Sequence, residues 1–266
     1  MLGLRASKGG PLLLESATDP PSLSEYVEIL AEHRLSEWAW GHYKDVLADL
    51  LRIQNAKRIM EIGAGRSPLF DRAEIEFSEA EYIINDVQPS ELARARGDVA
   101  KVCFDIASTS ATEIDTLANT VDLVFSKMVL EHVSDAQQAY KNIYKLLSPS
   151  GVCLNFHPVL FSLPFLMNYL APAGPTEWLV GKFSPNRSRE GQPKFPARYD
   201  SCRISKSVRS TLQLIGYRDV CQVPFWFHEY FKDIPGLQQC HLLFDKIAAR
   251  ANWTALASYC YTIAVK

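Results

Sequence analysis

The sequence lacks several features that would place it in a specialised class of proteins. It has no uninterrupted apolar run of about 18 residues, so we expect no membrane-spanning helix. The apolar run Leu12–Leu14 ends at Glu15 and is shorter than the core of a signal peptide. It has no excess of one charge, with 28 Lys and Arg against 30 Asp and Glu, which gives no overall attraction to nucleic acid. Its 47% hydrophobic and 22% charged residues exclude a disordered or a fibrous chain.

The six cysteines lack the spacing of a metal site. None belongs to a C-x-x-C pair, and no paired histidine spacing accompanies them, so we predict no metal. Cys103, Cys153 and Cys260 lie in apolar, strand-like runs, where a reduced cysteine packs as a small hydrophobic residue. We therefore expect a reduced, cytoplasmic protein.

The hydrophobic pattern that is present predicts an α/β fold. Residues 22–51 have helical spacing. After them, predicted strands (57–62, 82–86, 102–106, 121–126 and 152–157) alternate with helical segments, including a helix over 136–147 that ends in a turn at 148–151. This alternation indicates βαβ units and a mostly parallel sheet with helices on both faces. A helix over 207–215 and strands over 218–226 and 258–265, with an irregular stretch between them, complete the prediction.

Composition divides the chain into four predicted segments. Residues 1–52 form a leader and helical cap, 53–157 a ligand-binding core, 158–209 an insertion, and 210–266 the completion of the core sheet. The insertion is rich in proline. Its first part is apolar and aromatic, and its second part, 182–209, has eight Lys and Arg against two Asp and Glu.

A glycine turn follows the first predicted strand. In Glu61-Ile62-Gly63-Ala64-Gly65, the glycines let the backbone approach a ligand closely. In an open parallel sheet, ligands bind outside the carboxyl ends of the strands. Asp86 ends the next strand, 21 residues after Gly65, where a carboxylate can accept both hydroxyls of a ribose. The pattern fits any adenosine-containing cofactor.

Three further features separate the candidate cofactors. Pro68 stands where a dinucleotide fingerprint has its third glycine, and a cofactor without a pyrophosphate does not need that glycine. Glu61 precedes Gly63 by two residues, and the segment from Ser126 through Leu130-Glu131-His132 follows the fourth strand. With these motifs the chain resembles the class I S-adenosylmethionine-dependent methyltransferases, in the branch with a Leu-Glu-His segment, over about residues 57–156. A nicotinamide dehydrogenase is the less favoured alternative.

The resemblance implies a Rossmann-like, mostly parallel seven-stranded sheet with an antiparallel last strand, and a lid inserted after the fifth strand. It also implies S-adenosylmethionine as cofactor and S-adenosylhomocysteine as product. The implied cofactor-binding residues are Glu61 near the amino group, Gly63, Ala64 and Gly65 under the methionine and ribose, Asp86 on the ribose, Val87 and Gln88 beside the adenine, Asp105 and Ile106 at the adenine, and Ser126, Lys127 and Met128 beside the methionine. A loop-capping carboxylate is the alternative for Asp105.

The candidate catalytic residue is His132. Methyl transfer is an in-line displacement, in which positioning can supply roughly 7–11 kcal/mol. An alcohol acceptor also loses a proton, and a histidine titrates near neutral pH, so His132 is a candidate general base. The alternative is that it caps or packs the following helix. Tentative substrate-binding residues are His157, Arg198, Tyr199 and His228, with a structural role as the alternative for His157.

The apolar and basic halves of the insertion predict a small-molecule acceptor that is anionic or amphipathic. The C-terminal part is similar to methyltransferases of bacterial sugar and polysaccharide biosynthesis, in Asn155-Phe156-His157-Pro158 and in Lys194–Tyr199. A sugar hydroxyl or glycosylated intermediate is therefore the first acceptor hypothesis. A quinone-like lipid or natural product, methylated at O, N or C, is the second, and a catalytically silent cofactor-binding protein is the third.

The basic half also has other interpretations. A solvated loop and a peripheral contact with an anionic membrane both remain open. We recognise no nucleic-acid-binding module. The pattern leaves the oligomeric state undetermined.

Overall fold

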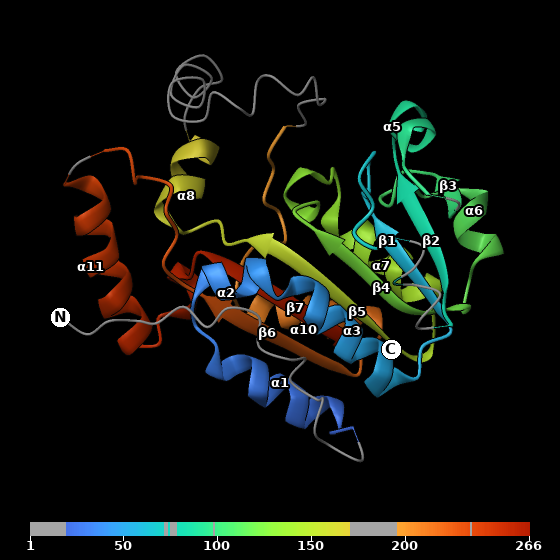
Figure 1. The fold of residues 1–266 in the computed structure, drawn as a ribbon, viewed down its shortest axis with the longest axis horizontal. Helices are drawn as coiled ribbons and strands as arrows, with labels where there is room; N and C mark the ends of the chain where they lie inside the picture. Colours follow the sequence, from blue (N-terminus) through green and yellow to red (C-terminus); the bar gives the residue numbers. More distant parts are fainter. Residues whose placement is uncertain (1–19, 72–73, 75–78, 98, 171–195, 235) are drawn as a thin grey trace.

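The computed structural model describes residues 20–71, 74, 79–97, 99–170, 196–234 and 236–266. Their centre is a seven-stranded sheet with the strand order β3-β2-β1-β4-β5-β7-β6 (Figure 1). The strands are β1 (Arg58–Ile62), β2 (Glu81–Asp86), β3 (Ala100–Cys103), β4 (Val121–Lys127), β5 (Leu147–Pro158), β6 (Asp219–Phe225) and β7 (Tyr259–Val265). Strands β1 to β5 pair in parallel, and β7 runs antiparallel between β5 and β6. This arrangement confirms the predicted fold class.

The described helices surround this sheet. They are α1 (Leu23–Glu32), α2 (Ser36–Gly41), α3 (Tyr43–Gln54), α5 (Pro89–Arg94), α6 (Thr112–Thr116), α7 (Ala136–Leu146), α8 (Leu163–Leu170), α10 (Lys206–Ile215), α11 (Leu237–Arg250), and two 3₁₀ turns, Leu130–His132 and Thr254–Leu256. Helices α2 and α3 lie over one face of the sheet, and α7 packs against α6 and α10 on the other (Figure 1). None of the described helices is long and apolar enough to cross a membrane.

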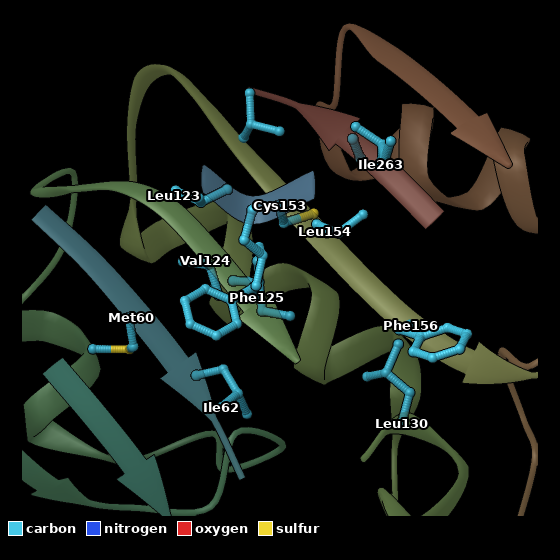
Figure 2. Close-up of a cluster of buried hydrophobic side chains, with 14 of the residues drawn as sticks. Met60, Ile62, Leu123, Val124, Phe125, Leu130, Cys153, Leu154, Phe156 and Ile263 are labelled. Atoms are coloured by element: carbon cyan, nitrogen blue, oxygen red, sulfur yellow. The ribbon is translucent and has the colours of Figure 1, made fainter. Parts of the chain in front are cut away.

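The two layers of helices explain why the central strands are apolar on both faces. Alternate residues of a strand point to opposite faces. In β5, the Phe156 ring packs against Tyr43 of α3, while Cys153 is buried near Tyr140 of α7. Figure 2 shows the central part of this core, where Val124 and Phe125 of β4 are completely buried.

The strand order reverses at β1, which lies between β2 and β4. The carboxyl ends of β1, β2 and β4 therefore meet at one edge of the sheet. That position is the usual ligand-binding crevice of an open α/β sheet.

Several predicted boundaries were wrong. The helical pattern predicted over residues 22–51 is confirmed by α1, α2 and α3, whereas the strand predicted over 102–106 is Ala100–Cys103. That strand ends early because Asp105 caps a turn, in which its Oδ1 accepts a hydrogen bond of 2.8 Å from the Ala107 N–H. The turn predicted at 148–151 is part of the start of β5, with Ser150 at φ 68°.

The stretch predicted to be irregular between β6 and β7 contains α11, a helix of 14 residues. Its pattern is inverted, because polar His241 and Asp245 are buried while Leu243 and Ile247 are exposed. A search for one apolar, inward-facing stripe does not recognise such a helix.

The predicted leader, residues 1–19, and residues 171–195 of the predicted insertion lie outside the described residues. The described parts of the insertion are residues 158–170, which include α8, and residues 196–209. All six cysteines are described and none forms a disulfide; Cys153 and Cys260 are buried as expected, whereas Cys103 is exposed on the edge strand β3.

Candidate active site

The glycine turn follows β1 and has the backbone conformation that requires glycine. Gly63 and Gly65 have φ values of 71° and 57°, in the left-handed region. A Cβ atom on Gly63 would lie 2.5 Å from Cγ2 of Val129, which follows β4. The turn and the segment after β4 are therefore packed as closely as their backbones allow.

Asp86, at the end of β2, holds this turn in place. Its Oδ2 accepts a hydrogen bond of 3.0 Å from the Gly65 N–H, and its Oδ1 accepts one of 2.8 Å from the Gln88 N–H. Each carboxylate oxygen can accept a further hydrogen bond. Val87 is 49% exposed beside it. The structure thus brings together the predicted residues of the turn with Asp86, Val87 and Gln88.

Glu61 lies beneath the turn and is 7% exposed. Its Oε2 accepts hydrogen bonds from the Leu69 N–H, at 2.9 Å, and from the Tyr82 hydroxyl. Burial raises the pKa of Glu61, and these two hydrogen bonds partly offset the effect. One carboxylate oxygen of Glu61 therefore fixes the loop after the glycine turn, a role that its sequence position did not indicate.

Lys127, at the end of β4, lies against aromatic rings. Its Nζ is 4.6 Å from the Trp40 ring centroid and 5.2 Å from that of Tyr43, within the range of a cation–π interaction. Burial lowers the pKa of Lys127, while attraction to Glu61 opposes this shift. The site thus contains a half-buried cation next to an aromatic surface.

The backbone turns sharply at Met128. Its φ of 58° is in the left-handed region, which costs a non-glycine residue roughly 1–2 kcal/mol. The Met128 N–H donates to the Phe156 carbonyl at 2.7 Å, so the turn is anchored to β5. Such conformations are frequent at functional sites. Ser126, just before the turn, is buried and donates to Oδ1 of Asn155 at 2.8 Å.

Asp105 and Ile106 are less suited to their predicted contact with adenine. One oxygen of Asp105 caps the local turn described above, which agrees with its loop-capping alternative. Ile106 is 5% exposed, and its carbonyl accepts a hydrogen bond of 2.7 Å from Asn142 of α7. Their contact with a cofactor stays a prediction.

The Leu-Glu-His segment forms the 3₁₀ turn Leu130–His132 after β4. The Glu131 carbonyl accepts hydrogen bonds from the N–H groups of Arg198 and Tyr199, at 2.6 and 3.2 Å. His132 is half-buried, with Nδ1 3.3 Å from the Pro196 carbonyl oxygen. The structure therefore brings the candidate base His132 together with Arg198 and Tyr199. Arg198 is exposed, whereas Tyr199 is buried and its hydroxyl accepts from Asn168 of α8.

His157 does not have the exposure of a substrate-binding residue. It is completely buried, its Nδ1 donates to the Pro158 carbonyl, and its Nε2 accepts from the Thr262 hydroxyl, both at 2.9 Å. Burial lowers the pKa of His157 to about 4. The structure corrects the predicted substrate contact in favour of the structural alternative.

His228 requires the same correction. It is 3% exposed, its Nδ1 accepts from the Tyr230 N–H at 3.1 Å, and its ring centroid is 4.0 Å from that of His241. Burial lowers the pKa of His228 to about 3. His228 therefore packs under α11 instead of pointing toward a substrate.

Sequence reasoning missed the aromatic residues that α2 and α3 contribute. Trp40 is 39% exposed, with its ring centroid 5.0 Å from Phe156 and 5.6 Å from Tyr259. The Tyr43 hydroxyl donates to the Ser126 carbonyl at 2.9 Å. The density of aromatic residues in Trp38–Tyr43 was the available signal, but a helical pattern does not show which part of a sheet a helix covers.

One crevice lies apart from the predicted site residues, and the described residues contain no metal-binding cluster. A crevice of about 280 Å³ between α7 and α10 is lined by residues including Asp135, Tyr140, Ser205 and Leu212, and by none of the predicted site residues. Among the described residues, no group of three His, Cys, Asp or Glu side chains is arranged to hold a metal ion.

Comparison with known proteins identifies the central region. Residues 60–155 match a family described as a methyltransferase domain. No curated protein matches the sequence.

Solved structures share the fold at low sequence identity. An S-adenosylmethionine-dependent methyltransferase from Archaeoglobus fulgidus has a TM-score of 0.50 and 16% identity, over 80% of this chain and 87% of the other. The CMeT domain of citrinin polyketide synthase has a TM-score of 0.51 and 15% identity, over 91% of this chain and 57% of the other. The CurJ carbon methyltransferase has a TM-score of 0.50 and 15% identity, over 92% and 58%.

Proposed function

We propose that this chain, whose residues 60–155 match a methyltransferase domain, is a class I S-adenosylmethionine-dependent methyltransferase that methylates a small-molecule acceptor, with a hydroxyl group of a sugar or glycosylated intermediate as the first candidate. The observation that carries the cofactor assignment is the closed arrangement of the glycine turn, Asp86 and Val129 at the reversal of strand order. A Cβ at Gly63 would collide with Val129, so glycine is needed there to keep the turn and the segment after β4 in contact.

The residues present fit S-adenosylmethionine. Asp86 retains lone pairs that can accept from ribose hydroxyls, and Val87 offers an exposed apolar side chain for an adenine ring. Position 68 is a proline, as a cofactor without phosphates permits. When bound, the cofactor supplies an electrophilic methyl group on a sulfonium. The chain's own part is to position the acceptor and to take its proton.

His132 is the proposed proton acceptor. It follows the end of β4, and the segment containing Pro196 and Arg198 lies against it. A neutral imidazole can take the proton of a hydroxyl group as that group attacks the methyl carbon. Tyr199, buried beside the same segment, would position the acceptor side of the site.

The surface near β4 supports an acceptor with an apolar face and a negative charge. Trp40 provides a half-exposed aromatic ring, Lys127 lies over it, and Arg198 is exposed nearby in the chain segment that contacts Glu131. Pockets for small molecules commonly combine an apolar lining with a few charged groups. A phosphorylated or nucleotide-linked sugar has both properties.

The second acceptor class, a quinone-like lipid or natural product methylated at O, N or C, is favoured by α8. This helix follows β5 and exposes Leu163, Met167 and Leu170. The two classes differ in whether the apolar or the charged part of the surface contacts the acceptor.

A transfer assay with methyl-labelled S-adenosylmethionine tests the proposal. We expect label in sugar nucleotides and less in quinone-like lipids, with turnover lowered about 10²–10⁴-fold by His132→Ala at unchanged cofactor affinity. His33→Ala, at the end of α1, is the matched control and should leave turnover unchanged. Full activity of His132→Ala would remove it as the base. Cofactor binding without transfer to any acceptor would favour the catalytically silent protein.

A further inference from the structure

Helix α11 turns its polar side inward. His241 and Asp245 are 4% and 1% exposed, with 3.3 Å between His241 Nε2 and Asp245 Oδ2. Oδ2 of Asp245 also accepts a hydrogen bond of 2.9 Å from the Phe227 N–H, which follows β6. Ala248 and Ala249 are buried beside them. These contacts fix which face of α11 points away from the sheet.

The outward face of α11 is apolar. Leu243, Phe244 and Ile247 are 61%, 45% and 50% exposed, and Cys240 is exposed as well. Positions 240, 243, 244 and 247 have the i, i+3, i+4, i+7 spacing of a single helix face. Scattered apolar residues are normal on a surface, but a continuous stripe marks an interaction site. We call these four residues, with their helix, the α11 face.

The charges that border the α11 face have one sign. Lys246 and Arg250 are exposed, and the one carboxylate among the 14 residues of α11, Asp245, points inward. Arg34 adds a third cation at the carboxyl end, where its Nη1 donates to the Ala249 carbonyl at 2.8 Å. The exposed acids Glu229 and Asp233 precede the helix at its other end, together with Lys232.

We propose that the α11 face binds the surface of a membrane that contains anionic lipids. An amphipathic helix with apolar residues on one face and Lys or Arg at its border is suited to lie in the plane of a lipid interface. Trp253, 50% exposed just after the helix, has a ring that prefers this interface. α11 lies at one end of the long axis of the molecule, remote from the turn after β1, so binding there would leave the site of methyl transfer open (Figure 1).

A second copy of this chain is a poorer occupant. In a two-fold symmetric contact the same patch meets itself. Lys246 and Arg250 border the α11 face, so a contact of this face with itself would bring cations together without an exposed carboxylate on either helix. Lipid headgroups with negative charge complement the same lysine and Arg250. The proposal is independent of the identity of the acceptor.

Vesicle sedimentation of the full chain tests the proposal. We expect the protein to bind vesicles of phosphatidylcholine with phosphatidylglycerol, and to bind phosphatidylcholine alone more weakly. Each Lys or Arg near an anionic surface contributes roughly fivefold to partitioning, so Lys246→Gln with Arg250→Gln should weaken binding roughly thirtyfold. Leu243→Glu with Ile247→Glu should abolish it.

Matched controls keep the result interpretable. Leu214→Glu changes a leucine of α10 that is 89% exposed, and Lys141→Gln with Lys206→Gln changes two exposed lysines elsewhere; both should bind vesicles as the unmodified chain does. Melting temperatures show whether each variant is folded. The absence of binding to anionic vesicles would overturn the proposal. So would a dimer, seen by analytical ultracentrifugation, that the Leu243→Glu and Ile247→Glu substitutions dissociate without affecting vesicle binding.

Discussion

Asp86 connects the backbone geometry of the site with its expected chemistry. Its two oxygens already accept hydrogen bonds from Gly65 and Gln88, so the side chain is fixed before any ligand binds. A ribose that donates hydrogen bonds to the remaining lone pairs of Asp86 would bind a carboxylate that is already oriented. This pre-orientation lowers the entropic cost of binding.

Replacing Asp86 should therefore weaken cofactor binding. We expect Asp86→Ala to reduce affinity for S-adenosylhomocysteine by about 1–3 kcal/mol, because two ribose hydroxyls and the Gly65 N–H lose an acceptor. Isothermal titration calorimetry measures the change. Asp115→Ala, which removes an exposed carboxylate of α6 paired with Lys145, is the control and should leave the dissociation constant unchanged. An unchanged constant for Asp86→Ala would contradict the ribose assignment.

At the scale of elements, the site depends on three segments that follow strands β1, β2 and β4. The segment after β1 contributes Gly63, the one after β2 follows Asp86, and the one after β4 contributes Met128 and Val129. The left-handed φ of Met128 places Val129 against Gly63. The turn after β1 and the segment after β4 therefore depend on each other for their conformations.

Gly63→Ala tests this dependence. The added methyl would be 2.5 Å from Val129, and the backbone conformation is one that alanine avoids. We therefore expect the free energy of unfolding to fall by at least about 1 kcal/mol and the affinity for the cofactor to fall as well. Urea denaturation and calorimetry measure the two effects. Gly41→Ala, in helix α2 with nothing within 4 Å of the added Cβ, should stabilise the protein by about 0.4–1 kcal/mol. Equal stability of Gly63→Ala and the unmodified chain would refute the close packing.

At the scale of the whole molecule, the sheet and helix α11 bury two histidines. His157 is enclosed between β5 and β7, and His228 lies under α11. Both have a pKa below the usual value of a histidine because burial disfavours the charged ring. The unfolded chain therefore binds protons more readily than the folded one as the pH falls.

This difference predicts acid sensitivity. Above about pH 6.5, His157 is neutral in both the folded and the unfolded state and does not change the free energy of unfolding. As the pH falls from there toward 4, His157 of the unfolded state is protonated first, so folding becomes less favourable. With a folded pKa of about 4, we expect His157 to lower the free energy of unfolding by about 2–3 kcal/mol between pH 7.5 and 4.5. Urea denaturation at both pH values measures it.

His157→Gln is the corresponding variant, because glutamine can keep a hydrogen bond but does not titrate. Its stability should depend less on pH over this range. Gln137→Ala, at an exposed position of α7 that does not titrate, should keep the full dependence. If His157→Gln kept it too, the acid sensitivity would have another origin.

The sequence by itself determined the class of fold and pointed to a candidate cofactor site. A parallel strand that is buried on both faces is a short, continuous apolar run, so strands such as 57–62 and 121–126 could be predicted from the sequence. The turn at Gly63 and Gly65 could also be predicted, because a left-handed backbone packed closely against another segment favours glycine.

The tertiary structure alone decided which side chains share a surface. Trp40 reaches the end of β4 because α2 crosses the sheet there, and His157 and His228 are buried because β7 and α11 cover them. Helix α11 was missed because its inward face is polar. The local sequence pattern predicts whether a side chain is buried only where apolar residues point inward and polar residues outward. Contacts between segments distant in the sequence, such as Glu131 with Arg198, depend on the assembled chain.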